Sequence, residues 1–491
     1  MLEKLLRLGK EAAIYGLSSI LGRFLNFLLV PFYTNYLLPS EYGVVATLYA
    51  YIAFMVIVYG YGMEAAYMRF FSTPEHGDAK QNFSTPFISL LGTSVLFSLV
   101  IHFSARSVAG WIGIGEEHAD LIRYAGWILF FDTLVAIPYA SLRMDHKAMK
   151  FAGLRVVNIL CNIALNILFI VGMGMKAEGV FLANLLALAF SFLLLFRTTV
   201  TQFTMSFSRG LYRDLLKFGL PYVPAGIAGA AMQVIDRPIL KALTDDATVG
   251  VYQANYRLGV LMMLVVGMFD YAWRPFFLQH AKDDDAKDLF ARVFTYFVAL
   301  MLFILISVSL FVDDLVRIQV FGKYFIHPDY WKGLTIVPII LLSYVFTGAY
   351  VNFVVGIYLE KKTKVLPYVT GAGAIVNVAV NFWLIPLYGI MGAAFATLAS
   401  YVVMAAGMYI ASQQVYRIKY EWSRILKLAA LTALVFAGAL LVPVEPASVS
   451  GLAIKAAWCL VFIVFAFLVR AFDPADIISM KQAIAKLLRR S

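Results

Sequence analysis

Long apolar runs recur along almost the whole chain, and they constrain its fold more than any other feature. Runs of about 20 mostly apolar residues, the length that crosses a bilayer as a helix, occur about fourteen times. Hydrophobic residues make up 62% of the 491 residues and charged residues only 14%, which is more apolar surface than one water-soluble core buries. The sequence predicts an all-α polytopic membrane protein.

The predicted transmembrane helices form two groups, separated by a polar stretch. The first group covers residues 12–38, 42–63, 83–103, 119–141, 153–174 and 177–196. The second group covers residues 216–241, 251–273, 290–312, 333–357, 366–386, 390–411, 425–442 and 452–470.

The distribution of Lys and Arg predicts how the chain lies in the membrane. Most of the 40 Lys and Arg fall in alternate connections between spans, and cationic connections are retained on the cytoplasmic side. We therefore expect both termini to be cytoplasmic. Because these cations are dispersed over several short loops, a nucleic-acid partner is not expected. The two cysteines lie within apolar spans, so neither a disulfide framework nor a zinc site is implied.

The two halves of the chain carry matching residues in the same order, which predicts an internal repeat. A repeat of six helices is even, so both copies keep the same orientation in the membrane. We predict two parallel six-helix lobes around a central cavity, followed by two extra helices. The matching residues are Pro31 with Pro238, Gly43 with Gly250, Glu64 with Asp270, and Asn162 and Asn166 with Asn377 and Asn381.

The repeat divides the chain into predicted regions. The N-lobe covers residues 1–200, a cytoplasmic linker covers 201–215, and the C-lobe covers 216–412. Residues 413–472 hold the two extra helices, and residues 473–491 form an amphipathic, basic tail on the cytoplasmic surface.

Charged side chains inside the spans mark candidate functional sites, because a charge in a bilayer faces a cavity, a partner or a pathway. Arg23 lies near the middle of the first span, and Arg237 and Arg257 lie in the seventh and eighth. Guanidinium groups suit bidentate contacts with phosphate oxygens. We expect these arginines to line one cavity and hold an anionic cargo. Polar residues near them are predicted to line the same cavity: Ser19, Asn26, Gln233, Gln253 and Asn255.

Structural alternatives exist for several of these residues. Arg23 has a possible partner in Asp132 of the fourth span, and Arg237 has one in the adjacent Asp236. The repeated asparagines are expected to be mainly structural, through hydrogen bonds between helices.

Acids in or beside the spans are few, and any H⁺ or Na⁺ coupling would use them or backbone carbonyls. They are Asp132, Asp236, Glu64 and Asp270. For Glu64 and Asp270 we slightly favour a gating or lobe-locking role, through ion pairs with Arg69 and Arg274. No other cofactor and no metal is expected.

Enzyme motifs are absent from the sequence, which contains no HExxH, CxxC pair, P-loop or GxSxG. The longest outer loop, residues 313–332, carries Asp313, Asp314, His327 and Asp329 but is short for a catalytic domain. The chain is therefore predicted not to be an enzyme. A membrane polysaccharide polymerase or ligase is the enzyme-class alternative.

Three segments resemble bacterial polysaccharide transporters of the multidrug, oligosaccharidyl-lipid and polysaccharide exporter superfamily: Ala12–Asn26, Leu38–Gly43 and Asn377–Ala394. The resemblance implies a flippase of the bacterial inner membrane. Such a protein moves an undecaprenyl-pyrophosphate-linked oligosaccharide from the cytoplasmic to the periplasmic leaflet by alternating access, for lipopolysaccharide or other surface polysaccharides. Related lipid II flippases carry cavity arginines on the first and eighth helices, where Arg23 and Arg257 lie here.

Two further functions are alternatives within the same superfamily, a lipid II flippase and a cation-coupled multidrug antiporter. The antiporters typically use an acid in the first helix, whereas span 12–38 contains Arg23 and no Asp or Glu. This difference favours an anionic lipid-linked cargo. The implied partners are the lipid-linked oligosaccharide, membrane lipid and other proteins of polysaccharide assembly.

Overall fold

The computed structural model describes residues 16, 21–22, 24–25, 27–71, 78–442 and 444–468. Within these residues, twelve helices are long and apolar enough to cross a membrane, or thirteen if one bent helix pair is counted as a single span. The first predicted span, 12–38, lies partly outside the described residues, and its residues 27–36 are helical. The prediction of an all-α polytopic membrane protein is confirmed.

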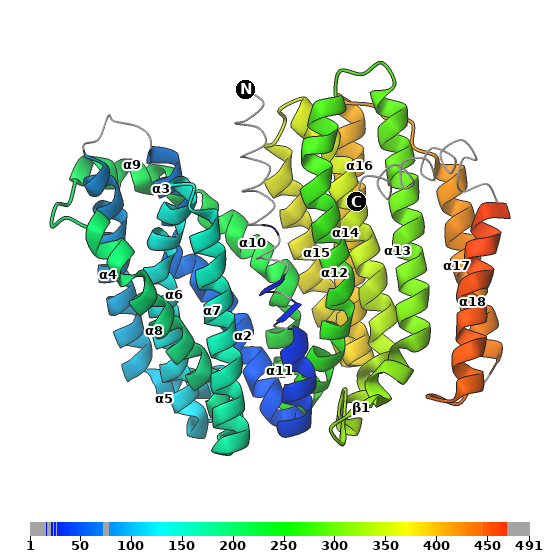
Figure 1. The fold of residues 1–491 in the computed structure, drawn as a ribbon, viewed down its shortest axis with the longest axis horizontal. Helices are drawn as coiled ribbons and strands as arrows, with labels where there is room; N and C mark the ends of the chain where they lie inside the picture. Colours follow the sequence, from blue (N-terminus) through cyan, green and yellow to red (C-terminus); the bar gives the residue numbers. More distant parts are fainter. Residues whose placement is uncertain are drawn as a thin grey trace. The chain divides into compact units, whose positions relative to one another are not determined.

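The chain divides into two compact units, and we describe each by itself. The first unit comprises residues 1–257, 327–333 and 370–400. Its early helices are α2 (Pro39–Gly60), α3 (Met63–Phe70), α4 (Ala79–Phe103), α5 (Ala105–Trp111), α6 (Ala119–Met144), α7 (Ala148–Asn166) and α8 (Lys176–Gln202) (Figure 1). A 3-10 turn at Glu116–His118 precedes α6, and a π-helical segment at Ile167–Gly172 follows α7.

The later helices of the first unit are α9 (Arg209–Gly219), α10 (Tyr222–Val234) and α11 (Asp236–Leu243). Three longer helices are shared between the units, namely α12 (Asp246–His280), α15 (Val365–Tyr388) and α16 (Ile390–Val415). The 3-10 segment Pro328–Ile336 lies between α13 and α14.

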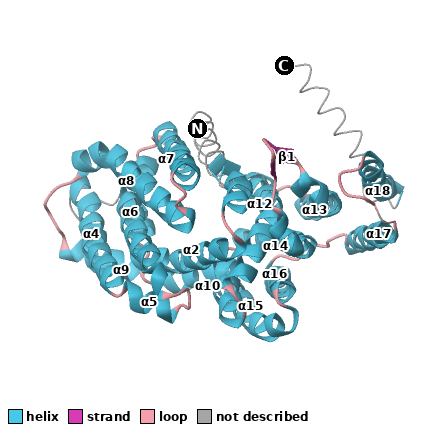
Figure 2. Cartoon of the chain, turned by 90° about the horizontal axis from the view of Figure 1, so that it is seen from below, coloured by secondary structure: helices cyan, strands magenta, loops and turns pink. Residues whose placement is uncertain are grey.

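Helix α6 is the central helix of the first unit. It packs against α2, α4 and α8, and Figure 2 shows it between them. In its most apolar stretch 72% of the residues are buried, against 17% for α7. A helix that is apolar on all sides is suited to such a central place, whereas α7 leaves most of its apolar surface for lipid.

The first turns of α2 and α12 are in backbone contact. A Cβ atom at Gly43 would overlap the carbonyl oxygen of Asp246, and one at Gly250 would overlap the carbonyl oxygen of Pro39. Glycine allows such an approach because it has no side chain between the two backbones. Since Pro39 and Asp246 are separated by the same number of residues as Gly43 and Gly250, the contact is reciprocal, in agreement with the predicted repeat.

The predicted seventh span, 216–241, is wrong as a single helix. It consists of parts of α9, α10 and α11, with a bend of 41° between α9 and α10. Pro221 lies at this bend, and proline cannot donate the backbone hydrogen bond that would continue α9. Gly219 packs there against Gly62, whose φ of +76° is suited to glycine. Pro238 lies in the first turn of α11, a position that proline favours at a helix start.

The second unit comprises residues 258–326, 334–369 and 401–491. Its helix α13 (Ala286–Arg317) packs against α14 (Val337–Leu359), α17 (Trp422–Leu441) and α18 (Val449–Leu468). Helices α17 and α18 fall within residues 413–472, where two extra helices were predicted. The short hairpin of β1 (Gln319–Val320) and β2 (Lys323–Tyr324) pairs antiparallel.

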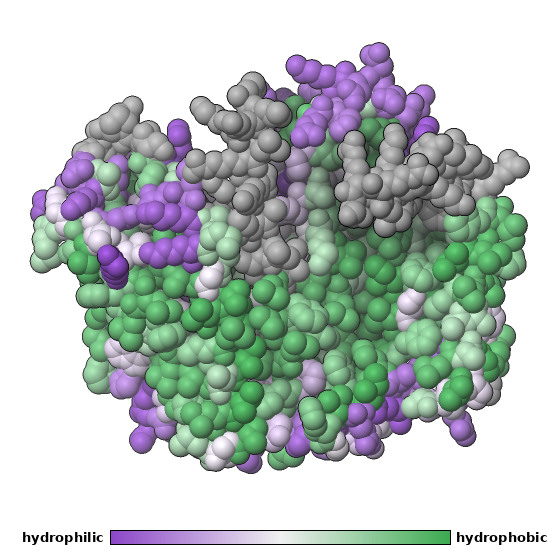
Figure 3. Space-filling view, viewed as in Figure 1, coloured by the Kyte–Doolittle hydropathy of each residue, from purple (hydrophilic) through white to green (hydrophobic). Residues whose placement is uncertain are grey.

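Surface hydropathy agrees with a membrane environment. Figure 3 shows hydrophobic residues along the sides of the helices and hydrophilic residues gathered towards their ends. The predicted amphipathic tail at 473–491 lies outside the described residues.

Candidate functional site

A polar cavity of about 250 Å³ lies inside the first unit. The helical residues 27–36 and helices α2, α7, α8 and α12 contribute to its wall. Polar groups that converge in a cavity between apolar helices are the usual mark of a binding site in a membrane protein. The polar residues that line it are Tyr33, Tyr42, Tyr49, Asn158, Asn162, Asn184, Gln253 and Arg257.

Arg257 supplies the positive charge of this cavity. Its side chain is half-buried, and it lies within electrostatic reach of the phenol groups of Tyr33, Tyr42 and Tyr49. No carboxylate among the cavity-lining residues that the structure describes offsets the charge. The guanidinium is therefore available to an anion.

Hydrogen bonds between helices hold the polar wall in place. Asn184 of α8 donates to the Tyr49 hydroxyl at 2.8 Å, and the Tyr33 hydroxyl donates to the Asn166 side chain at 3.0 Å. Asn158 of α7 donates to the Ser191 hydroxyl of α8 at 2.7 Å. Side chains fixed in this way can receive a ligand with little loss of conformational entropy.

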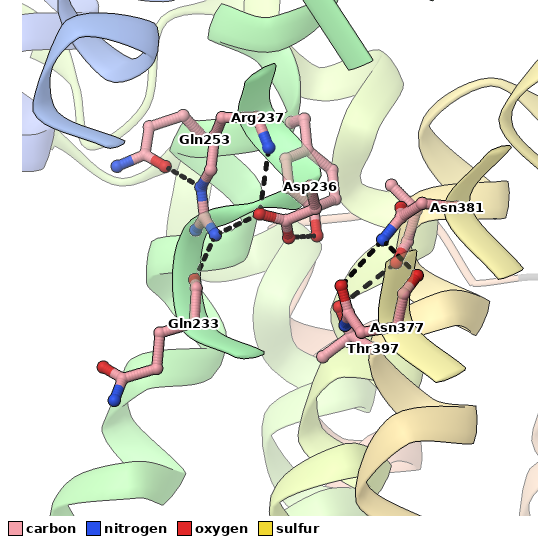
Figure 4. Close-up of polar contacts among 9 residues, drawn as sticks. Gln233, Asp236, Arg237, Gln253, Asn377, Asn381 and Thr397 are labelled. Carbon is pink, nitrogen blue, oxygen red and sulfur yellow. Dashed lines mark hydrogen bonds and ion pairs between the residues drawn. The ribbon is translucent and has the colours of Figure 1, made fainter. Parts of the chain in front are cut away.

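Arg237 lies beside the cavity in a network of its own, shown in Figure 4. Only 4% of its surface is exposed. Its guanidinium forms an ion pair with Asp236, donates to the carbonyl oxygen of Gln233, and lies over the ring of Tyr256 at 4.2 Å from the ring centre. Asp236 also accepts a hydrogen bond from the Tyr252 hydroxyl. The geometry thus follows the structural alternative for Arg237, and this arginine is not among the cavity-lining residues.

Gln253 connects this network to the cavity. Its side-chain oxygen accepts a hydrogen bond from Nε of Arg237 at 3.1 Å, while the residue lines the cavity. Because its oxygen is already engaged, Gln253 can offer a ligand only the N–H groups of its amide, which also lie beside the Tyr42 hydroxyl. Arg237 is therefore connected to the cavity through Gln253.

Two other residues predicted to line the cavity, Gln233 and Asn255, lie elsewhere. Gln233 has an exposed side chain that points away from the Arg237 guanidinium (Figure 4). Asn255 is fully buried and donates to the carbonyl oxygens of Val251 and Tyr330, both at 2.8 Å, so it holds the segment after α13 against α12. Ser19, Arg23 and Asn26 lie outside the described residues.

A second cavity of the first unit, about 400 Å³, brings together two acids and two arginines. Glu64 pairs with Arg143 at 2.9 Å. The prediction that Glu64 pairs with Arg69 is therefore wrong, and the side chain of Arg69 is exposed. Asp132 lies within electrostatic reach of Arg155 in the same cavity. Opposite charges balance here, in contrast to the cavity that contains Arg257.

Two ion pairs stand out in the second unit. Arg274 binds Asp270 through two hydrogen bonds of 2.9 Å, which confirms the predicted pair. Sequence reasoning missed the buried pair between Lys455 of α18 and Asp314 of α13. A single Lys inside an apolar span was the available signal.

The repeated asparagines adopt the same local geometry in both copies. The side chain of Asn166 donates to the backbone and side-chain oxygens of Asn162, and Asn381 does the same with Asn377, at distances of 2.8 to 3.0 Å. These bonds each lie within a single helix, and the expected bond between helices is present in the first copy, where Tyr33 donates to Asn166. Figure 4 shows the second copy.

None of the three tyrosines at the cavity was predicted, and two of its asparagines were not predicted either. Tyr33, Tyr42, Tyr49, Asn158 and Asn184 were all missed, although Asn158 and Asn184 stand out as amides within apolar spans. Among the described residues, no group of three His, Cys, Asp or Glu is placed to hold a metal ion.

Comparison with known proteins identifies the family. Residues 8–281, more than half of the chain, match the model of the polysaccharide biosynthesis protein family. The chain belongs to this family. The resemblance of its sequence motifs to proteins of bacterial polysaccharide synthesis is therefore confirmed. The chain is also similar to the Haemophilus influenzae protein named Lsg locus putative protein 1, with 20% identity over 352 residues, which cover 69% of this chain and 84% of that protein.

Solved structures of a lipid II flippase and of multidrug transporters share the fold of this chain. A lipid II flippase MurJ in an inward closed conformation has a TM-score of 0.73 and 15% identity, covering 95% of this chain and 99% of that one. An inward-facing multidrug resistance MATE family transporter of the MOP superfamily has a TM-score of 0.63 and 15% identity, covering 80% of this chain and 94% of that one.

Proposed function

We propose that this protein is a flippase for an undecaprenyl-pyrophosphate-linked oligosaccharide. It moves this cargo from the cytoplasmic to the periplasmic leaflet of a bacterial inner membrane by alternating access, for the synthesis of a cell-surface polysaccharide. Membership of the polysaccharide biosynthesis protein family supports this proposal. The observation that carries it is Arg257, a cation without an opposing carboxylate in a polar cavity between apolar helices.

The chemistry of the cavity suits the polar end of such a lipid. Arg257 binds the pyrophosphate, because a guanidinium offers paired N–H donors to phosphate oxygens. The amides of Asn158, Asn162 and Asn184 suit sugar hydroxyls, which both donate and accept hydrogen bonds. The prenyl chain stays in lipid, since it is apolar and gains nothing from a polar cavity.

A second candidate cargo is lipid II, and the likeness to the lipid II flippase MurJ favours it. Both cargoes present a pyrophosphate to Arg257 and differ in the attached sugars. A multidrug antiporter is less well supported, because the cavity is lined by a cation and no acid among the described residues.

The candidate catalytic residues of the predicted outer loop, 313–332, do not support an enzyme function either. Asp313 pairs with Arg317, and Asp314 pairs with Lys455, so both carboxylates have structural partners. The remaining His327 and Asp329 lie 3.3 Å apart with half-exposed side chains. The acids of the second cavity, Glu64 and Asp132, are the groups of the first unit that we propose for H⁺ or Na⁺ coupling.

Binding and flipping by the Arg257→Ala variant test the proposal. In nanodiscs, the affinity for a polyprenyl-pyrophosphate oligosaccharide should fall by about 10- to 100-fold, the effect of losing charge-assisted hydrogen bonds. Flipping in proteoliposomes should fall in parallel. Arg123→Ala is the matched control, because Arg123 pairs with Asp120 in the first turns of α6 and lines neither cavity.

Comparison of cargoes completes this test. Equal affinity of the Arg257→Ala and wild-type proteins would reject the assignment of the cavity. Tighter binding of lipid II than of oligosaccharides with other sugars, together with rescue of cells depleted of their own lipid II flippase, would replace the proposed cargo by lipid II.

A further inference from the structure

A small basic recess lies at the adjoining ends of α7 and α8, apart from both cavities described above. It has a volume of about 170 Å³. Its charged members come from the first turn of α7 and the last turns of α8. The recess is lined by Lys147, Lys150, Arg197, Thr198, Thr201 and Gln202.

Two of its cations carry charge that no acid offsets. Lys147 pairs with Asp145 at 2.9 Å, and Gln202 donates to the same carboxylate oxygen at 3.1 Å. Lys150 donates instead to the neutral hydroxyl of Thr198 at 2.9 Å. Neither Lys150 nor Arg197 forms an ion pair with a carboxylate in the part of the chain that the structure describes. The recess therefore keeps a net charge near +2 after Asp145 is counted.

The positions of these two cations are defined by their helices. The bond to Thr198 ties the end of the Lys150 side chain to α8 and leaves two ammonium N–H groups for a ligand. Arg197 is exposed and lies one residue before Thr198. Because α7 and α8 pack against each other, an anion between them can contact both.

Apolar side chains continue from the recess along the membrane-facing surface of both helices. Leu193 lies one turn from Arg197 on α8 and is 66% exposed, and Val157 lies two turns from Lys150 on α7 and is 41% exposed. Phe196 and Val200 add further exposed apolar surface on α8. The basic recess therefore adjoins an exposed apolar surface, so that one amphipathic molecule can contact both with its charged and its hydrocarbon part.

We propose that this recess binds the headgroup of an anionic phospholipid, with its acyl chains along α7 and α8. Basic pockets at the ends of transmembrane helices attract anionic lipids, because each Lys or Arg near the membrane surface adds electrostatic attraction. A zwitterionic phospholipid carries an ammonium of its own, which Lys150 and Arg197 repel. The lipid belongs to the leaflet predicted to be cytoplasmic, because Lys147, Lys150 and Arg197 lie in connections on that predicted side.

Lipid binding to the purified protein tests this inference independently of the transported cargo. Phosphatidylglycerol and phosphatidylcholine with the same acyl chains are added to protein in detergent, and bound lipid is counted by native mass spectrometry. The wild-type protein should retain phosphatidylglycerol at least about 10-fold more strongly, as expected for two uncompensated cations. Equal retention of both lipids would overturn the proposal without any variant.

Variants locate the site. The Lys150→Gln, Arg197→Gln double variant should lose the preference for phosphatidylglycerol, and the Lys150→Arg, Arg197→Lys double variant should keep it. The control is Arg209→Gln with Arg213→Gln, which removes the same charge from exposed positions of α9 outside the recess.

Two further outcomes would overturn the inference. One is a preference that persists in the Lys150→Gln, Arg197→Gln variant. The other is complete displacement of phosphatidylglycerol by millimolar inorganic phosphate, which would mean that the recess is a site for free phosphate. Affinity for the polyprenyl-pyrophosphate oligosaccharide should be the same in all these variants, because the recess lines neither cavity.

Discussion

Gly43 of α2 and Gly250 of α12 lie against each other's helix, so that a Cβ on either one would meet a carbonyl oxygen of the opposite backbone. The two glycines hold equivalent positions in the predicted repeat. The helices that carry much of the polar cavity, including Tyr42, Gln253 and Arg257, are therefore in register through a contact between their backbones.

Gly43→Ala should destabilise the protein, because the added methyl group has no space and the first turns of both helices must separate. Overpacking of this kind typically costs about 1–3 kcal/mol. Thermal unfolding in detergent measures the effect. Gly92→Ala is the control, since a Cβ there meets nothing within 4 Å in the interior of α4. An unfolding temperature of Gly43→Ala equal to that of Gly92→Ala would contradict the tight crossing.

Gln253→Glu should weaken cargo binding without unfolding the protein. The new carboxylate still accepts the hydrogen bond from Arg237 Nε, so Arg237 keeps its partners. It also places a negative charge in the cavity, and the affinity for a polyprenyl-pyrophosphate oligosaccharide should fall by about 10-fold or more, since like charges in a site of low dielectric repel. Gln233→Glu is the matched control, because Gln233 was predicted to line the same cavity but is exposed and lies outside it. Equal losses in both variants would show that the effect is not specific to the cavity.

Asp314→Asn should strongly destabilise the second unit. The change leaves Lys455 buried without its counter-charge, and breaking a buried pair from one side typically costs about 3–5 kcal/mol. The neighbouring variant Asp313→Asn serves as control, because its pair with Arg317 is one-third exposed and such pairs contribute about 0–1 kcal/mol. Thermal unfolding separates the two variants. The Asp314–Lys455 pair would lose its assigned role if both unfolded at the same temperature.

The sequence was sufficient for most helices because burial in lipid depends on composition over about 20 residues. The division of span 216–241 was missed for a local reason. Pro221 and Pro238 interrupt the backbone hydrogen bonds of a segment that is mostly apolar, and hydropathy does not register such a break.

The site was predictable only in part. Arg257 follows from the cost of a charge in a membrane, whereas the position of Arg237 depends on how α11 and α12 are rotated against each other. Tyr252 and Gln253 of α12 come close to it only after the chain folds. Tyr33, Tyr42 and Tyr49 are three of 28 tyrosines, and nothing in their local sequence distinguishes them.

The two asparagine motifs differ in what lies beside them. In the first copy the Asn166 side-chain oxygen accepts the hydrogen bond from Tyr33, whereas the equivalent oxygen of Asn381 is buried without a hydrogen-bond partner among the described residues. At the repeat offset that relates Gly43 to Gly250, Leu240 stands in the place of Tyr33. If the halves arose by duplication of one ancestral segment, the hydrogen bonds between the two asparagines of each helix were kept while the residues around them changed. In the first copy the second asparagine also links two helices, and in the other copy, within the described part of the chain, the two asparagines bond only within their own helix.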